Sequence, residues 1–404
     1  MPDGALEGIR VIELGQIVSA PYCARLFADY GADVIKVEPP GDGDIARRWG
    51  PFPQDQPDPE KSGLLFFMNT NKRGVTLDVT VPRGRDLLIE LLREADLFIE
   101  NSRPQQMRDW GLDYASLSHV NANLVMISIT PFGQTGPYSD WNGYDLNAFH
   151  LSATGHRYCG RPGEAPLEQG AFSADFFGAV AGAAWGLAAL YGRQPAGGGQ
   201  HIDVSCAEVI AATFVGAQNI GGYAQDGVFE RRTGVGMPLG APATILPCKD
   251  GHVWMLALEA RQWNALADVM GNPDWMQLEM FQDMFVRAEN ADAMYPLLQE
   301  WTMQHTKREI MDMCQAKGCP STAIFTVGEA SELPHLRERG YIVDIDHPLL
   351  GSLRDFGAPF KLPESPGGPS RPAPQLGQHN EEVFGTLLGI GAAELSKLTS
   401  DGVI

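Results

Sequence analysis

The stretch GIRVIELGQIVSAPYCARLFADYGADVIKVE, residues 8–38, decides the fold of this chain. Residues 8–14 form a short apolar run rich in valine and isoleucine and bounded by glycines, which is typical of a buried strand. Residues 20–30 have the pattern of a helix that ends at Gly31, and residues 32–38 form a second apolar run. Strand, helix and strand in such a short segment indicate a right-handed crossover and a parallel sheet.

The same alternation continues along the first part of the chain. We expect strands at 74–79, 96–101 and 124–130, and helices at 82–95 and near 105–110. This pattern predicts an open α/β fold of Rossmann type. The loop after the first strand reads GQIVSAP rather than GxGxxG, which argues against a nicotinamide-dependent dehydrogenase.

The chain changes character after a strand and helix expected within residues 199–213. A glycine- and proline-rich interval leads to a predicted β-hairpin at 243–258, followed by helical stretches and then, from about Gly328, by loops and short strands. The helices that we expect in this part and at the end of the chain are 262–270, 291–305, 307–317 and 381–398. We therefore predict a large Rossmann-like domain built from 1–217 and 329–404, with 218–328 forming a linker and a smaller inserted α+β domain.

Composition and charge narrow the classes of partner. Hydrophobic residues make up 44% and charged residues 20% of the 404 residues, and the formal net charge is −20. Such an acidic chain is not expected to bind nucleic acid or an anionic membrane surface. The start has neither the basic nor the apolar part of a signal peptide, and we expect no apolar run long enough to span a membrane. The six cysteines include no CxxC pair, so we expect no metal site and a reduced, cytoplasmic compartment.

An anionic ligand would require a local gathering of basic residues in so acidic a chain. Open α/β sheets bind ligands at the loops that follow the C-terminal ends of their strands. The basic residues in or near these loops are Lys72, Arg73, Arg103 and Arg108. We expect them to lie on the side of the sheet where a phosphorylated ligand binds.

Asp175 stands between a turn-rich lead-in and the apolar run FFGAVAGAAWGLAALYG. This position predicts a helix N-cap, where backbone N–H groups and the helix dipole favour an ionised carboxylate. Gly178, Gly182 and Gly186 would share one helix face, which indicates close approach of another backbone or of a flat ligand. Asp175 is thus either a structural cap or a carboxylate nucleophile.

Several motifs together resemble family III CoA-transferases, the group that includes formyl-CoA transferase and carnitine CoA-transferase. The segments, which follow one another in the family's order, are LEGIRVIELG (6–15), NTNKRGVTLDV (69–79), QGAFSADFFG (169–178), GGGQHIDVS (197–205) and RPAPQLGQHN (371–380). The resemblance implies that Asp175 attacks an acyl-CoA thioester and forms a mixed anhydride, then an aspartyl-CoA thioester. It implies no tightly bound cofactor, with coenzyme A thioesters and free carboxylic acids as substrates. It also implies an interlocked homodimer, or a heteromer with a homologous subunit.

The resemblance also implies a set of CoA contacts. Leu77 matches a position beside the adenine, and the segment Asn101, Ser102 and Arg103 matches a loop that borders the nucleotide and its phosphates. Thr130, Pro131 and Phe132 match a segment along the pantetheine. The set is completed by Arg108, next to Asp109 where the family usually has an arginine, and by Val18, where formyl-CoA transferase has a glutamine. The valine favours an acyl group larger than formyl.

Two alternatives and one substrate hypothesis accompany this interpretation. Related α-methylacyl-CoA racemases carry GHD where this chain has Gly143, Tyr144 and Asp145, and a tyrosine titrates too high to be an easy base. A non-catalytic acyl-CoA-binding subunit of a heteromer is the second alternative. An aromatic-rich set suggests a bulky or aromatic acceptor acid such as benzylsuccinate, with succinyl-CoA as a donor; the set is Phe132, Tyr138, Trp141, Phe172, Phe176 and Phe177. The glycines around 234–240 either resemble a mobile loop that covers the nucleophile in formyl-CoA transferase or form a plain flexible linker.

Overall fold

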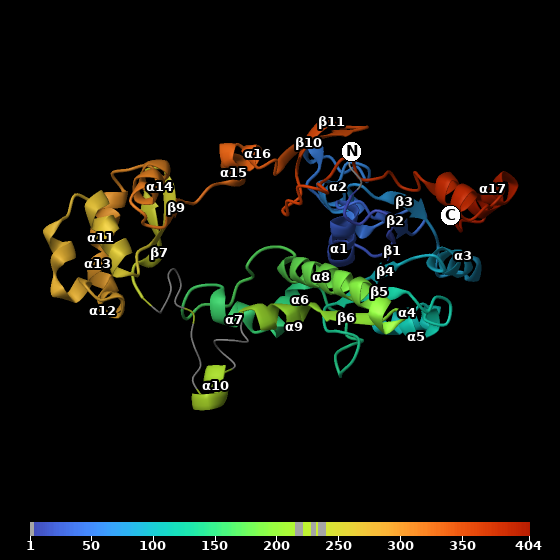
Figure 1. Ribbon diagram of the computed structural model, residues 1–404, viewed down its shortest axis with the longest axis horizontal. Helices are drawn as coiled ribbons and strands as arrows, with labels where there is room; N and C mark the ends of the chain where they lie inside the picture. Colours follow the sequence, from blue (N-terminus) through green and yellow to red (C-terminus); the bar gives the residue numbers. More distant parts are fainter. Residues whose placement is uncertain (1–3, 215–220, 228–231, 233–239) are drawn as a thin grey trace. The chain divides into compact units, whose positions relative to one another are not determined.

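The computed structural model describes residues 4–214, 221–227, 232 and 240–404 (Figure 1). The chain forms two compact units. The first contains Met1–Gly155, Glu168–Phe229 and His335–Ile404, and the second contains His156–Leu167 and Glu230–Pro334. Residues 156–167, which we expected in the large domain, thus belong to the smaller unit. The predicted glycine loop at 234–240 lies almost entirely outside the described residues.

The first unit is built on a six-stranded parallel sheet in the order β3-β2-β1-β4-β5-β6. Its strands are β1 (Arg10–Leu14), β2 (Asp33–Glu38), β3 (Arg73–Thr76), β4 (Leu97–Glu100), β5 (Val125–Thr130) and β6 (His201–Ser205). This is the strand order of a Rossmann fold, and the order reverses its progression between β1 and β4. The predicted fold class is therefore confirmed.

The helices of the first unit lie between and after the strands of the sheet. They are α1 (Ser19–Ala28), α2 (Gly63–Asn69), α3 (Pro82–Leu92), α4 (Pro104–Trp110), α5 (Tyr114–Leu117), α6 (Asp145–Leu151), α7 (Thr154–Tyr158, which reaches into the second unit), α8 (Ser173–Ala196), α9 (Cys206–Ile210), α10 (Gly221–Asp226), α16 (Pro334–Glu338) and α17 (Ala392–Ser400). Short 3-10 turns η1 (Ile45–Arg48) and η2 (Pro53–Asp55) and the π-helix η6 (Glu381–Leu387) complete the set. A hairpin of β10 (Ile342–His347) and β11 (Gly351–Phe356) precedes the C-terminal segment.

Helices cover both faces of the sheet. On one face, Leu88 and Leu92 of α3 and Phe384 of the C-terminal segment share a core with Ile12 and Phe98. On the other face, α1 and α8 pack against each other and against β5 (Figure 1). This second face carries α8, the helix whose first turn contains Asp175.

The glycines of α8 permit close packing on β5 and α9. A Cβ atom at Gly178 would lie 2.5 Å from the Cys206 sulfur, and one at Gly186 would lie 2.6 Å from Ile127. The helix thus rests on side chains of the protein itself, not on a flat ligand. Contrary to our expectation, α8 is long and apolar enough to cross a membrane by length and composition alone, the one such helix in the described part of the chain. Because α8 packs on the sheet, its apolar residues also serve as part of the protein core.

The second unit has its own sheet and core. Strands β7 (Ala243–Cys248), β8 (Gly251–Leu256) and β9 (Ser321–Ala323) form an antiparallel sheet. The helices are α11 (Ala260–Val269), α12 (Met284–Glu289), α13 (Ala291–Thr302), α14 (Lys307–Ala316) and α15 (Val327–Ser331), with the 3-10 turns η4 (Asp274–Gln277) and η5 (Glu279–Phe281). Trp263, Phe281 and Ile310 centre its core. The predicted hairpin is present, and its turn falls at Lys249 and Asp250.

Candidate active site

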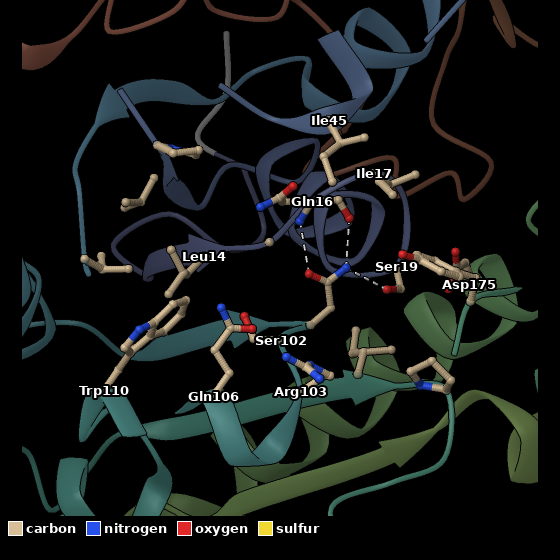
Figure 2. Close-up of a pocket in the computed structure, with 18 of the residues that line it drawn as sticks. Leu14, Gln16, Ile17, Ser19, Ile45, Ser102, Arg103, Gln106, Trp110 and Asp175 are labelled. Carbon is tan, nitrogen blue, oxygen red and sulfur yellow. Dashed lines mark hydrogen bonds between the residues drawn. The ribbon is translucent and has the colours of Figure 1, made fainter. Parts of the chain in front are cut away.

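A cavity of about 570 Å³ opens at the C-terminal edge of the parallel sheet. Its walls come from the loops that follow β1, β2, β3, β4 and β5, together with Asp175 from the first turn of α8 (Figure 2). The cavity lies beyond the C-terminal ends of the paired strands β1 and β4, where the strand order reverses. Open α/β sheets bind their ligands at this place, and the volume is in the usual range of small-molecule sites.

Asp175 occupies the third position of α8, so the expectation that it caps the helix is wrong. The cap is Phe172, whose φ of 62° places it in the left-handed region. The backbone N–H of Asp175 donates to Oδ1 of Asp145 over 2.9 Å, and its side chain faces the cavity. The Asp175 carboxyl is therefore held by its backbone in the first helical turn while its oxygens stay accessible to a ligand.

Three carboxyl groups, those of Asp145, Glu168 and Asp175, form what we call the acid cluster. Burial and then the charge of Asp145 raise the pKa of Asp175 to about 7. A hydrogen bond with Asp145, together with burial, raises the pKa of Glu168 to about 7. The helix N-terminus therefore does not keep Asp175 as acidic as we expected, because burial and a like charge outweigh it. A carboxylate with a raised pKa is a stronger nucleophile once it is ionised.

A buried thiol lies against this cluster. Cys206 begins α9 and its pKa is raised well above the ordinary value by burial and by the charges of Asp175 and Asp145. The thiol thus stays protonated and apolar in character. The thiol packs against α8 at Gly178, one turn after Asp175.

The loop after β1 is fixed by Asn101. Its Oδ1 accepts from the Gln16 backbone N–H at 3.0 Å, and its Nδ2 donates to the Gln16 carbonyl at 2.8 Å and to Ser19 Oγ at 3.0 Å (Figure 2). Asn101 follows β4, so this amide joins the loops of the two strands that flank the reversal point. Asn101 therefore shapes the cavity in addition to lining it.

The structure brings together only part of the residue set implied by the motifs. Asp175, Leu77, Asn101, Ser102, Arg103 and Pro131 line the cavity. Val18, Thr130, Phe132 and Arg108 are not among the residues that line it. Val18 and Thr130 are buried, and Thr130 Oγ1 accepts from the Gly133 N–H. Phe132 packs edge-on against Trp141, and Arg108 pairs with Asp140 at 3.0 Å.

The expected gathering of basic side chains is reduced to Arg103. Lys72 is buried and its Nζ lies 2.6 Å from Oε2 of Glu13. Arg73 is bound to Asp33 and Glu382. Each of these cations is neutralised by a carboxylate in the fold, which loop positions alone do not reveal. Arg103 is exposed, and its Nη1 donates to the Asn142 side chain at 3.1 Å.

Some lining residues were missed by the sequence-based prediction. They include Gln16, Ile17, Ser19, Gln106, Trp110, Asn142 and Tyr144. A signal existed for those in the loops after β1 and β4, because such loops face the ligand side of the sheet. Asp145 was missed as a neighbour of Asp175 because the two lie 30 positions apart and meet only through the packing of α6 on α8. Of the aromatic set expected near the acyl group, no member is among the described residues that line the cavity.

Comparisons with known proteins match nearly the whole length of this chain. The family model of CoA-transferase family III matches residues 6–380. The chain is 34% identical to the succinyl-CoA–D-citramalate CoA-transferase of Chloroflexus aurantiacus, over 100% of this chain and 99% of that protein. It is 32% identical to the succinate–glutarate CoA-transferase of Agrobacterium fabrum, over 95% of each. The crystal structure of a CAIB/BAIF family protein from Brucella suis matches with a TM-score of 0.84 and 29% identity, over 95% of this chain and 100% of that one.

Proposed function

Because this chain belongs to CoA-transferase family III and is a CoA-transferase, we propose that Asp175 is the nucleophile that carries CoA from one carboxylic acid to another. The observation that supports this role is the position of its carboxyl group. It lines the same cavity as Leu77, Asn101 and Arg103, which the family resemblance matches to CoA contacts. One side chain able to form an acyl bond thus stands where the thioester end of a bound CoA would lie.

The proposed reaction consists of four exchanges that balance without a net proton. An Asp175 oxygen attacks the thioester carbon of the donor, the C–S bond breaks, and a mixed anhydride and CoA thiolate form. The thiolate attacks the Asp175 carbonyl carbon, which releases the donor acid and leaves an aspartyl-CoA thioester. The acceptor carboxylate attacks the carbonyl carbon of this thioester, the C–S bond breaks, and a second anhydride and CoA thiolate form. The thiolate then attacks the acceptor carbonyl, giving the new acyl-CoA and free Asp175.

The surroundings of Asp175 suit this chemistry. A partly desolvated carboxylate attacks more readily than a fully hydrated one, and the neighbouring charge of Asp145 raises its basicity further. Arg103 is the cationic side chain among the described residues that line the cavity, so we assign it to a CoA phosphate. Trp110 and Leu77 supply apolar surface in the same cavity for the remainder of the CoA moiety.

For the substrates, we propose succinyl-CoA as donor and a dicarboxylic acid as acceptor. The names of the relatives from Chloroflexus aurantiacus and Agrobacterium fabrum pair succinyl-CoA or succinate with citramalate or glutarate. Benzylsuccinate, an aromatic dicarboxylate, remains the bulky member of this predicted class. A screen of glutarate, citramalate, benzylsuccinate and oxalate with succinyl-CoA would rank them, and a preference for oxalate would contradict the proposal.

We also propose that the chain acts as a dimer, either of two copies or with a homologous subunit. Trp185 and Tyr191 of α8 are 66% and 84% exposed, and a second cavity of about 500 Å³ lies between α8 and the edge strand β6. Exposed aromatic side chains beside an unpaired strand edge favour an interface. Light scattering on the purified chain tests this proposal, with a monomer mass as the contradicting result. We further propose a cytoplasmic location, which remains a prediction from the cysteine pattern of the sequence.

Chemical trapping tests the proposed nucleophile. The protein is incubated with succinyl-CoA and then with hydroxylamine, which converts an activated aspartyl group to a hydroxamate, and the peptides are mapped by mass. We expect the modification at Asp175 alone. The Asp175→Ala protein should give none, whereas Asp109→Ala, which removes an exposed carboxylate of α4, should be labelled as the natural chain is. CoA binding without any adduct would indicate the non-catalytic alternative, and exchange of the α-proton of a branched acyl-CoA would indicate the racemase.

A further inference from the structure

The loop between β1 and α1 contains a conformation that its sequence disfavours. Ile17 has a φ of 65°, in the left-handed region. Glycine and asparagine enter this region readily, but a β-branched side chain there is an outlier. Such conformations persist only where the surroundings hold them, and they concentrate at functional sites.

A buried ion pair holds Ile17 in place. Its backbone N–H donates to Asp44 Oδ1 at 2.9 Å, and Asp44 Oδ2 lies 2.8 Å from Lys36 Nζ. The same ammonium group donates to the Gly15 carbonyl at 3.0 Å and to Glu13 at 2.9 Å. Asp44 and Lys36 are almost completely shielded from solvent. Charge-assisted hydrogen bonds in such an environment are strong, so the buried Asp44 and Lys36 fix the conformation of the loop.

Gln16, between these two anchored residues, is held as well. Asn101 bonds both its backbone N–H and its carbonyl. The two consecutive peptide units between Gly15 and Ile17 therefore have both their C=O and their N–H groups fixed by the side chains of three residues, Lys36, Asp44 and Asn101. A loop whose only task was to connect a strand to a helix would not require such control.

The side chain of Ile17 lines the cavity, while that of the following residue, Val18, is completely buried. In Figure 2, Leu14 and Trp110 lie at one end of the cavity, and Ile17 and Ser19 are drawn toward the end that contains Asp175. The packing agrees, because Tyr22 in α1 contacts Phe176 in the first turn of α8 with ring centroids 4.9 Å apart. The start of α1 and the start of α8 therefore meet at this end.

The residue before α8 has the same left-handed backbone conformation as Ile17. Phe172 also has a positive φ, of 62°, and its ring lies 5.4 Å from that of Trp49. Each of the two helices whose first turns meet near Asp175 is thus preceded by a bulky residue in the left-handed region. Different neighbours hold these two residues, Asp44 in the case of Ile17 and Trp49 in the case of Phe172.

We propose that Ile17 is a residue that sets which acyl groups the cavity accepts, and that Asp44 is the positioning residue that holds it there. The proposal rests on the role of Asp175 as the acyl-bearing group, since that role makes this end of the cavity the acyl end. A fixed apolar side chain there limits the size of the acyl group. One methylene in such a pocket changes selectivity by about 10- to 200-fold, whereas a mobile side chain would yield.

The test measures binding, so that it needs no turnover. Dissociation constants of free CoA and benzoyl-CoA are determined by calorimetry for the natural chain, Ile17→Gly and Ile17→Asn. Glycine and asparagine both adopt a positive φ, so both variants keep the loop conformation. We expect Ile17→Gly to favour benzoyl-CoA over free CoA at least about tenfold more than the natural chain does. We expect Ile17→Asn, which fills similar space, to change this ratio by less than about threefold.

Leu14→Ala is the matched control, since it removes apolar bulk at the other end of the cavity. It should weaken both ligands equally and leave the ratio unchanged. A ratio in Ile17→Gly equal to that of the natural chain would overturn the role of Ile17. Loss of CoA exchange in the natural chain would overturn the proposed function instead, and the binding ratios would still decide the role of Ile17.

A double-mutant cycle tests Asp44. In Asp44→Asn the charge opposite Lys36 is lost, so the anchor of Ile17 is weakened. We expect this change to alter the benzoyl-CoA to CoA ratio in the natural background, and to leave it unchanged in the Ile17→Gly background, where there is no side chain to position. An equal effect in both backgrounds would mean that Asp44 acts on the cavity by another route, and would overturn its positioning role.

Discussion

Two groups of ionisable side chains, one buried and the other partly buried, lie in the same unit and differ in their electrostatics. The first, which we call the paired network, joins Lys36 and Lys72 to Glu13 and Asp44. Burial opposes the charges of Lys36 and Asp44, but Lys36 lowers the pKa of Asp44, and Asp44 and Glu13 raise that of Lys36. At Lys72 burial prevails over the attraction of Glu13 and lowers the pKa to about 8. In the acid cluster, by contrast, the neighbouring charge that shifts the pKa of Asp175 has the same sign and raises it further.

The comparison shows how one cavity can combine a rigid wall with a reactive group. Complementary charges below the loop fix the backbone of residues 15–17. The like charge of Asp145 at the start of α8 makes the Asp175 carboxylate more basic. It therefore binds a proton, or an acyl group in its place, more readily. The first group should therefore matter for stability and the second for reactivity. Substitutions can test this division.

The largest effect is expected for the acid cluster and concerns rate. Replacing Asp175 by Asn keeps the shape of the side chain and removes its ability to attack a thioester. We expect CoA exchange to fall by about 10⁴-fold, as for other covalent nucleophiles, while the variant still folds. Steady-state exchange between succinyl-CoA and glutarate measures this, with circular dichroism as the control for folding. A rate within about tenfold of the natural chain would break the assignment of reactivity to this cluster.

The next effect concerns the paired network and stability. Glu13→Gln removes the carboxylate that contacts both buried lysines, so we expect the free energy of unfolding to fall by roughly 3–5 kcal/mol. The same substitution at Glu394, which forms an exposed pair with Arg83, should cost less than about 1 kcal/mol. Urea denaturation of both variants gives the two values. Equal losses would show that the network does not act as a structural anchor.

The third effect is a displacement of the pH profile. Asp175 attacks as its ionised form, so kcat/KM should fall as the pH drops below about 7, the value to which burial and Asp145 raise the pKa of Asp175. Asp145→Asn keeps an acceptor for the Asp175 N–H and removes the charge. We expect the midpoint to move to lower pH by about one unit. An unmoved midpoint would mean that Asp145 has only a structural role.

The smallest effect is a gain in stability, whereas most substitutions lower the free energy of unfolding. The folded chain holds a proton on Asp175 that the unfolded chain releases at lower pH, so this group favours folding at low pH. That contribution is lost as the pH rises through about 7, where the buried charge must be accommodated. Asp175→Asn should therefore be more stable than the natural chain by roughly 1 kcal/mol at pH 8, and not at pH 4. A loss of stability at pH 8 would contradict the idea of an unfavourable acid cluster.

The sequence predicted elements better than it predicted their surroundings. Strong local signals placed the strands β1, β2 and β5 and the helix after Asp175, because apolar runs bounded by glycines have few other uses. The C-terminal helix expected at 381–398 is instead two helices, η6 and α17, separated by a segment that contains Gly389 and Gly391. The strand β9 was missed, and β10 and β11 were expected only as short strands without bounds after about Gly328, because short strands of mixed polarity lack a clear alternation.

For the site, too, the sequence predicted local features better than contacts between distant segments. Asp175 could be found because its local context and the family motifs agreed. The burial of Lys72, the pairing of Arg108 and the neighbourhood of Asp145 could not, since each depends on contacts between distant segments. The left-handed conformation of Ile17 has no local signal at all, because isoleucine is among the residues least suited to it.

Transfer of an isotope tests the central claim most directly. In the proposed sequence, the acceptor acid leaves one of its carboxylate oxygens on Asp175 at the end of each turnover, and the next donor acid removes it. The chain is therefore allowed to turn over with succinyl-CoA and glutarate labelled with ¹⁸O in its carboxyl groups, and the peptide that contains Asp175 is weighed. We predict that ¹⁸O appears in Asp175 and in the released succinate. Vigorous CoA exchange with no label in that peptide would contradict the account.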